Sequence, residues 1–264
     1  MIKALVSALT LALTALSGPA FAEISYVGSP TIGLHIIPEA ARVFTKKTGI
    51  RFGAIEIQGS GKGLEMILGG QAQLAGVSRS LTLDEKTRRI HYQVIGYDAV
   101  SVFVHPTNPV TTLTREQLKS IYTGRITNWK DVGGPDARIV WITQILSGDR
   151  GQMIEFQRDV MDGASLRRDR REVDQQSDQV TALISERYGI AEISRAFARR
   201  GIKAVSIDGF PPEPKTILSG AYILSRPLLL VSEAHPNAEV KQFLAFMLTR
   251  EGQEIVAWKF VPVR

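Results

Sequence analysis

The stretch IEIQGSGKGLEMIL, residues 55–68, joins a short apolar strand to a helical run through a glycine-rich loop. Residues 55–57 alternate between apolar and polar side chains, as a strand does, and the apolar residues of 64–68 recur at helical spacing. A strand that turns directly into a helix is the repeating unit of α/β proteins. The stretch therefore predicts an α/β fold.

The same unit recurs along the chain. Apolar strands are expected at residues 24–27, 74–77 and 139–142, and each ends in a loop that carries serine or threonine. Further strands are expected at 99–104, 204–207 and 228–231, and helices at 38–47, 114–122, 151–161, 180–187, 191–199, 239–248 and 251–258. This alternation predicts mostly parallel sheets covered by helices.

The first 22 residues have the pattern of a secretory signal. A short basic start precedes the apolar run 4–16, and Ala20 and Ala22 form the A-x-A pattern that signal peptidase reads. The run is shorter than the ~20 residues that a membrane-spanning helix needs, and Pro19 interrupts it near its end. We expect cleavage before Glu23, no membrane anchor in the mature protein, and a periplasmic location.

Composition narrows the choice of partners. The net charge of +6 makes the protein mildly attractive to anions of any kind. The densest basic cluster, residues 167–171, contains no aromatic side chain, and a nucleic-acid groove needs aromatics on which bases stack. We therefore expect a solvated surface there and no nucleic-acid partner. Because the chain has no cysteine, it forms neither a disulfide nor a lipid anchor at the signal junction.

The loop of residues 59–63 looks like the phosphate loop of nucleotide hydrolases only at first sight. Such a loop requires glycine at the position of Glu56 and serine or threonine at the position of Gly63. The carboxylate and the missing hydroxyl for magnesium exclude ATP and GTP. The dinucleotide fingerprint also fails, because no third glycine follows Gly59 and Gly61 at the required place.

Four strand-to-helix corners carry small or hydroxyl-bearing residues. The first N–H groups of a helix have no partner within it and carry about half a unit of positive charge, so such corners bind anions. Serine and threonine are also the commonest N-caps, which leaves a purely structural role open for each corner alone. Four corners in one chain favour an anion site, with donors from Ser29, Thr31, Ser60, Gly61, Ser78, Ser147 and Gly148.

Enzymatic machinery is not recognisable in the sequence. The four histidines are scattered, with no pair at metal-ligand spacing, and no G-x-S-x-G elbow presents a serine nucleophile. We therefore expect no catalytic residue, metal or other cofactor, and interpret each histidine as a surface or capping residue.

A series of motifs matches one family. It comprises GSPTIG (28–33), IQGSGKG (57–63), AGVSRSLT (75–82), YDAVSVFVHPTNPV (97–110), SGDRGQMIEF (147–156), SIDGFPPEPKTILSGAYILSRPLLL (206–230) and FMLTREGQEIV (246–256). The segment LTREQLKSIYTGRITNWKDVGG (113–134) is a specific signature. In this order they cover nearly the whole mature chain, which resembles the phosphate-binding proteins of phosphate ABC transporters, in the type II branch of the periplasmic binding proteins.

The resemblance implies two α/β lobes joined by a hinge of two crossings, with the ligand between them. Mapped onto this chain, the first lobe comprises residues 23–98 and 224–264, and the second comprises residues 99–223. The crossings lie near 99–104 and 225–229. In such proteins, closure of the lobes buries an anion that is held by helix N-termini and hydroxyl groups.

Carried over position by position, the resemblance implies ligand contacts from both lobes. The first lobe contributes Thr31 and the Ile32 backbone, Ser60 with Gly61, and the pair Ser78 and Arg79, beside Ser29 of the first corner; the second contributes Ser147, Gly148 and Asp149.

Three positions depart from the family pattern. The family usually has threonine at the position of Asp149 and arginine at that of Thr143. Its high-affinity members place an aspartate, which accepts the phosphate's own proton, where this chain has Arg79. The chain has thus exchanged charges across the cleft, with a cation on the first lobe and a carboxylate on the second.

Two roles of Asp149 stay open. A carboxylate ~4 Å from an oxyanion repels it by about 4 kcal/mol per unit charge at an effective dielectric constant of ~20, or about a thousandfold in affinity. If Asp149 accepts the proton of a protonated phosphate, this penalty falls only on sulfate-like ligands. Alternatively, Asp149 pairs with Arg79 or Arg150 and latches the lobes.

The leading hypothesis is a monomeric periplasmic solute receptor, not an enzyme, that binds inorganic phosphate or a related oxyanion and delivers it to the membrane permease of an ABC transporter. The alternative is a binding or signalling protein of the same fold that takes a different small anion, or none, and acts through a sensor or surface partner. A phosphoryl-transfer enzyme is a third interpretation. Lys62 either adds positive field at the cleft mouth or faces water.

Overall fold

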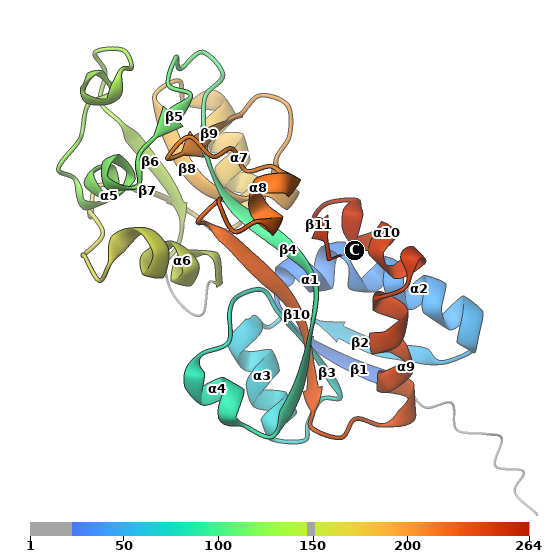
Figure 1. Cartoon of the computed structure of the whole chain (residues 1–264). Coiled ribbons are helices and arrows are strands. Elements are labelled where there is room, and N and C mark those ends of the chain that lie inside the picture. The colour runs from blue at the N-terminus through green and yellow to red at the C-terminus, as the bar shows by residue number, and fades with distance from the viewer. Residues whose placement is uncertain (1–22, 147–150, 264) are drawn as a thin grey trace, which may run out of the picture.

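Two lobes of strands and helices lie at opposite ends of a pair of long strands, β4 (Ile90–Val104) and β10 (Ser225–Glu233) (Figure 1). The computed structural model describes residues 23–146 and 151–263, and the expected signal segment lies outside them. Among these residues, no helix has the length and apolar character that crossing a membrane requires.

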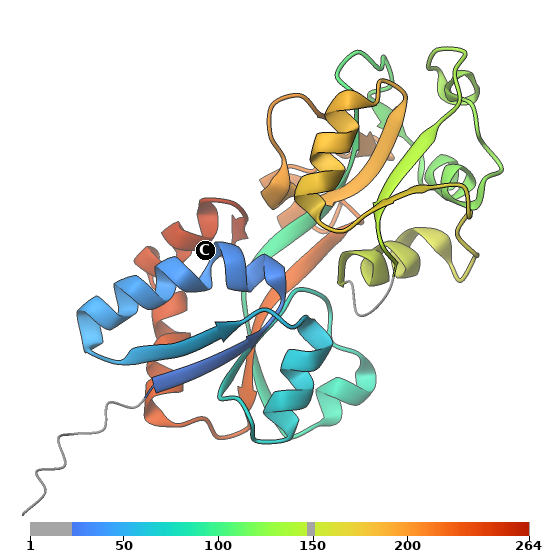
Figure 2. The ribbon, with the colours of Figure 1, turned by 180° about the vertical axis from the view of Figure 1, so that it is seen from behind.

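The first lobe is built on three parallel strands: β1 (Glu23–Gly28) lies between β2 (Arg51–Glu56) and β3 (Leu74–Val77). Its helices are α1 (Pro30–His35), α2 (Ile37–Thr48), α3 (Ser60–Leu68), α4 (Leu83–Thr87), α9 (Ala238–Met247) and α10 (Arg250–Ala257). Tyr26 packs with α1, α2 and α9, and Val27 packs with α3. Alternate residues of β1 therefore face two helical layers, which Figure 2 shows on either side of the strands.

The second lobe is built around β6 (Val140–Gln144), which runs parallel to β7 (Arg171–Val173) and β8 (Gly189–Ser194). The strand β9 (Lys203–Ile207) pairs with β4 and with the short β5 (Thr112–Leu113). The helical elements are α5 (Arg115–Thr123), the 3-10 helix η1 (Trp129–Val132), α6 (Gly151–Phe156), the π-helix η2 (Gln157–Met161), α7 (Gln176–Ser185), the 3-10 helix η3 (Arg195–Phe197) and α8 (Pro214–Leu218). Tyr122 and Trp129 of the signature segment are fully buried in this core, so the signature is largely a packing motif.

The strands β4 and β10 join the lobes into one mixed sheet, with the order β2-β1-β3-β10-β4-β8-β6-β7. The first part of β4 pairs antiparallel with β10, its last residues pair with β8, and β11 (Val261–Pro262) adds a short ladder. Ile95 of β4 belongs to the first core and Val100 to the second. Both strands cross between the cores, as the two-crossing fold requires, and the expected lobe boundaries stay a prediction.

Three sequence-based expectations about the fold are wrong. Residues 191–199, expected to be helical, form most of β8 and the turn η3. Every residue of β8 is buried, so the strand lacks the alternation that normally identifies one. The sheet is mixed rather than mostly parallel, because β4 and β10 run antiparallel to their neighbours. His35, expected as a surface or capping residue, is half-buried and packs edge-on against Phe197.

Candidate functional site

The hydroxyl groups expected to bind an anion in the first lobe lie together where β1 and β3 end. Ser29 follows β1 and caps α1 by accepting a hydrogen bond from Thr31 N–H at 3.1 Å. Ser78 follows β3, and its hydroxyl lies 2.7 Å from that of Ser29. Ile32, whose backbone is expected to contact the anion, follows Thr31 in α1 and is fully buried. Neighbouring parallel strands end at one edge of the sheet, which brings these distant segments together.

Ser60 opens α3 and joins the same group. The backbone N–H of Ser78 donates to Ser60 Oγ at 3.2 Å. The N-cap residue Gly59 has a φ of 95° and provides no side-chain cap. The first turn of α3, which includes Gly61, therefore begins without a capping side chain, and its amides suit an anion.

These four residues, Ser29, Thr31, Ser60 and Ser78, form what we call the hydroxyl cluster. Each is no more than 4% exposed. Ser60 Oγ already accepts a backbone N–H, so its own proton is left for another acceptor. Of the mutually bonded Ser29 and Ser78 hydroxyls, one proton is likewise left over. The cluster therefore offers neutral donors, which suits an oxyanion.

The glycine-rich loop lacks the chemistry of a nucleotide site in three dimensions as well. Lys62 pairs with Glu65 at 3.2 Å, and its side chain is 51% exposed, so it faces water. A Cβ on Gly63 would lie 2.8 Å from the carbonyl oxygen of Val27. The close packing of α3 on β1 thus excludes the serine or threonine that a magnesium-binding loop needs at this position.

Arg79 follows the cluster, and its guanidinium is paired within the first lobe. Nη1 and Nη2 each donate to a carboxylate oxygen of Glu85 at 2.8 Å, and Nη1 also donates to Ser80 O at 3.2 Å. The hydrogen bond from Arg79 lowers the pKa of Glu85, although partial burial opposes this. A bidentate ion pair offsets most of the charge that Arg79 would bring to a ligand. A contact of Arg79 with the anion stays a prediction.

Two buried charged residues that sequence reasoning missed adjoin the cluster. Arg226 of β10 and Asp98 of β4 are each 1% exposed, and Arg226 Nε and Nη2 donate to Asp98 Oδ2 at 3.0 and 2.7 Å. Nη1 also donates to Ser78 O at 3.0 Å, and Nη2 to Thr31 Oγ1 at 3.3 Å. The sequence carried one signal of this pair: each of two mainly apolar strands contains a single charged residue, Asp98 in YDAVSVFV and Arg226 in SRPLLLV.

The expected contacts from the second lobe, Ser147, Gly148 and Asp149, lie outside the described residues. Nearby, Thr143 donates its hydroxyl to the buried carboxylate of Glu192 on β8. Glu192 also accepts hydrogen bonds from Tyr122 Oη at 3.1 Å and from Trp141 Nε1 at 2.8 Å. Burial raises the pKa of Glu192 to about 7, against the opposing effect of these hydrogen bonds. The resemblance leads us to expect an arginine at the position of Thr143. This chain instead has a threonine that is hydrogen-bonded to a titratable acid, Glu192.

The two lobes meet beside the hydroxyl cluster. Ser80 donates its backbone N–H to Glu155 Oε1 of α6 at 2.7 Å. Glu155 is fully buried and forms an ion pair with Arg158, one turn further along. The carboxylate therefore holds the segment after β3 against the second lobe, two residues from Ser78.

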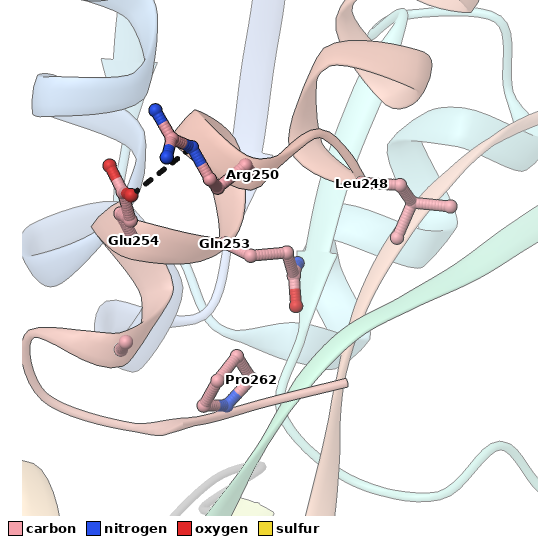
Figure 3. A pocket seen from close by; sticks show the side chains of 6 residues that line it. Leu248, Arg250, Gln253, Glu254 and Pro262 are labelled. Carbon is pink, nitrogen blue, oxygen red and sulfur yellow. Dashed lines mark ion pairs between the residues drawn. The ribbon is translucent and has the colours of Figure 1, made fainter. Parts of the chain in front are cut away.

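A pocket of about 430 Å³ lies away from the cluster, between α10 and β11 (Figure 3). It is lined by Leu248, Arg250, Gln253, Glu254, Ala257 and Pro262. Gln253 serves the fold here, because its amide donates to Ile95 O and Met247 O and accepts the N–H of Val263. None of the expected ligand residues that the structure describes lines this pocket, so it is not the candidate site.

Comparison with known proteins identifies the family. Residues 14–251 match the model of the PBP superfamily domain. The phosphate-binding protein PstS of Borreliella burgdorferi is 28% identical over 247 residues, which cover 89% of this chain and 88% of that protein.

Solved structures agree in fold. A protein from Clostridium perfringens, described as a phosphate ABC transporter substrate-binding protein with bound phosphate, has a TM-score of 0.81 and 31% identity, covering 92% of this chain and 100% of that chain. An ABC-type phosphate transport receptor from Vibrio cholerae has a TM-score of 0.80 and 28% identity, covering 90% and 99%. The chain therefore belongs to the PBP superfamily and, within its type II fold, to the PstS-like phosphate-binding proteins.

Proposed function

We propose that this protein is a periplasmic receptor that binds inorganic phosphate between its lobes and delivers it to the permease of an ABC transporter. The observation that carries the proposal is the hydroxyl cluster, buried where parallel strands turn into helices. The relatives support it, since one is named for phosphate binding and a similar structure contains bound phosphate.

The cluster suits phosphate because neutral donors and helix amides replace the anion's hydration shell. A hydrogen bond to a charged group contributes about 1.5–3 kcal/mol. Three such bonds contribute about 5–9 kcal/mol, which approaches micromolar affinity before the second lobe adds its contacts. The dipole of α3, a helix of nine residues that begins at Ser60, adds a favourable field.

Closure of the lobes completes the site in this proposal. Residues 23–98 and 224–264 form one lobe and residues 99–223 the other, with crossings near 99–104 and 225–229. Ser147, Gly148 and Asp149 contact the anion from the second lobe, and the contact between Ser80 and Glu155 holds the closed form. Arg79 acts from the first lobe, with its charge shared with Glu85.

Export and delivery follow from the same assignment. The segment 1–22 is removed as a signal peptide, which leaves a monomer free in the periplasm. The protein binds and releases phosphate unchanged, so it is a carrier rather than an enzyme. Its partners are phosphate and the membrane permease.

Titration calorimetry on refolded, ligand-free protein tests this function. Phosphate and arsenate are expected to give saturable heat, and sulfate much less. The absence of heat with phosphate at about millimolar concentration, where even weak carriers bind, would contradict the proposal.

Glu192 favours a second candidate function. Thr143, which is hydrogen-bonded to this buried carboxylate, supplies no cation at the position where the family usually has arginine, and this suits a receptor for a different small anion, or a signalling protein that acts through a sensor. Heat with another small anion and none with phosphate, in the same titration, would support this candidate instead.

A further inference from the structure

Arg226 links the hydroxyl cluster to the strands that join the lobes. It lies on β10 opposite Asp98 of β4, and both residues are 1% exposed. The guanidinium reaches past Asp98 to Thr31 Oγ1 at 3.3 Å and to Ser78 O at 3.0 Å. One buried side chain thus touches two of the three corners that build the first lobe's half of the site.

The chemistry of a guanidinium decides the direction of these bonds. Arginine has only donors, so Thr31 Oγ1 must be the acceptor in its contact with Nη2. The single hydroxyl proton of Thr31 is then left to donate elsewhere. Nη1 donates to the Ser78 carbonyl oxygen. The Ser78 N–H in turn donates to Ser60 Oγ at 3.2 Å, so the hydroxyl proton of Ser60 is also left to donate elsewhere.

Arg226 is poorly placed to bind an anion through its own charge. Two of its nitrogens donate to Asp98 Oδ2, at 3.0 and 2.7 Å, so the two charges offset each other. Nε, Nη1 and Nη2 each already have an acceptor. With 1% of the residue exposed, a ligand in the cleft meets Thr31 and Ser78 rather than the guanidinium.

We propose that Arg226 is a positioning residue for anion recognition: it orients the hydroxyl proton of Thr31 toward the ligand, so that Thr31 joins Ser60 in presenting a donor. This inference rests on the phosphate binding proposed above. A set of donors does not distinguish phosphate from sulfate, since only phosphate has a proton to give. Discrimination between the two must then come from acceptors on the second lobe.

A double-mutant cycle between Arg226→Lys and Thr31→Val tests the proposal. Lysine keeps a charge for Asp98 but lacks the fork that reaches Thr31 and Ser78, and valine removes the hydroxyl while keeping its shape. Each single variant is expected to weaken phosphate binding about tenfold, and the double variant also about tenfold, because Arg226 acts through the Thr31 hydroxyl. A loss of about a hundredfold in the double variant, the product of independent effects, would overturn the proposal.

Arg167→Lys is the matched control. Arg167 is a buried arginine of the second lobe that donates to Ile121 O and Ile139 O of that lobe, at 3.5 and 3.0 Å, rather than to the cluster. Its exchange is expected to leave phosphate affinity within about twofold and to combine multiplicatively with Thr31→Val. If the wild-type protein does not bind phosphate at all, the proposed function and this inference both fail. If the wild type binds phosphate strongly but the double variant shows the product of the two single effects, only this inference fails.

A second measurement keeps Arg226 in place and so does not depend on the folding of its variant. The side-chain ¹⁵N resonances of Arg226 are followed during phosphate titration of wild-type protein and of Thr31→Val. A shift in the wild type that disappears in Thr31→Val is expected, because the hydroxyl carries the effect. A shift of equal size in both proteins would show direct contact with the anion and overturn the proposal.

Discussion

Ser60 shows how one hydroxyl can serve both the fold and a ligand. Its oxygen accepts the Ser78 N–H, which ties the start of α3 to the end of β3. Its proton is left for the anion. Because the residue is 3% exposed, water cannot replace either interaction without opening the site.

Ser60→Ala is therefore expected to weaken phosphate binding by about tenfold or more, since it removes a donor to a charged group and leaves the Ser78 N–H without its acceptor. Titration calorimetry measures the change. Ser177→Ala, at an exposed position of α7, is the matched control and is expected to bind as the wild type does. Unchanged affinity in Ser60→Ala would remove Ser60 from the site.

Asp149 is the residue on which selectivity depends in our interpretation. If it accepts the proton of phosphate, Asp149→Thr relaxes the rejection of sulfate, because the repulsion of about 4 kcal/mol at an effective dielectric constant of ~20 disappears. Competition between phosphate and sulfate in calorimetry measures this ratio. An unchanged ratio would contradict the role as proton acceptor and favour the lobe latch.

At the scale of elements, β8 carries the least expected feature of the molecule. The strand is buried along its whole length, yet it contains Glu192, which accepts three side-chain hydrogen bonds. A hydroxyl such as Thr143 can donate to the carboxylate or accept from the protonated acid. Threonine at this position therefore accommodates both protonation states of Glu192, which an arginine would not.

The raised pKa of Glu192 makes stability depend on pH. The folded state binds the proton more tightly, since the pKa moves from 4.5 to about 7, so the contribution to stability is complete below pH 4.5 and is lost as pH rises to about 7. The loss amounts to about 3 kcal/mol. Glu192→Gln resembles the protonated acid and is expected to be more stable than wild type at about pH 8, and similar to it at about pH 4.5.

Urea unfolding of both proteins at several pH values measures this difference. Glu233→Gln, which changes an exposed carboxylate at the end of β10, is the control and should follow the wild-type curve. The same fall in stability with pH in wild type and in Glu192→Gln would mean that folding does not raise the pKa of Glu192.

At the scale of the whole molecule, two long strands and one buried carboxylate hold the lobes together. The strands β4 and β10 pass from one core to the other, and Glu155 reaches from α6 to the Ser80 amide at 2.7 Å. Glu155→Ala removes the acceptor, whereas Glu155→Gln keeps an oxygen for Ser80 and removes only the charge.

We expect the compaction that small-angle scattering records on phosphate addition to be smaller in Glu155→Ala than in wild type, with affinity reduced about tenfold, because the partly buried Ser80 N–H loses its charged acceptor. Glu155→Gln is expected to retain most of the compaction. Equal compaction in all three proteins would show that this contact does not contribute to closure.

Much of the fold could be predicted from local patterns, and the failures have physical causes. The residues Leu74–Val77 were expected as a strand and form β3, because a short apolar run bounded by turn residues is unambiguous. The residues of β8 do not show a strand pattern, because burial on both faces removes alternation. The first-lobe hydroxyls are predictable because corners between strands and helices are local. Arg226 and Asp98 are not, because their pairing depends on the register of strand residues 128 positions apart.

The sequence by itself determined the strand-to-helix corners, the hydroxyl residues placed at them and the absence of a nucleotide loop, since each depends on neighbours within a few positions. Only the tertiary structure decided which charges those hydroxyls meet. It paired Arg79 with Glu85, put Arg226 against Thr31 and Ser78, and buried Glu192 without an ion-pair partner among the described residues. Electrostatic partners are chosen by packing across the sheet and between the lobes, where distance in space is independent of distance along the chain.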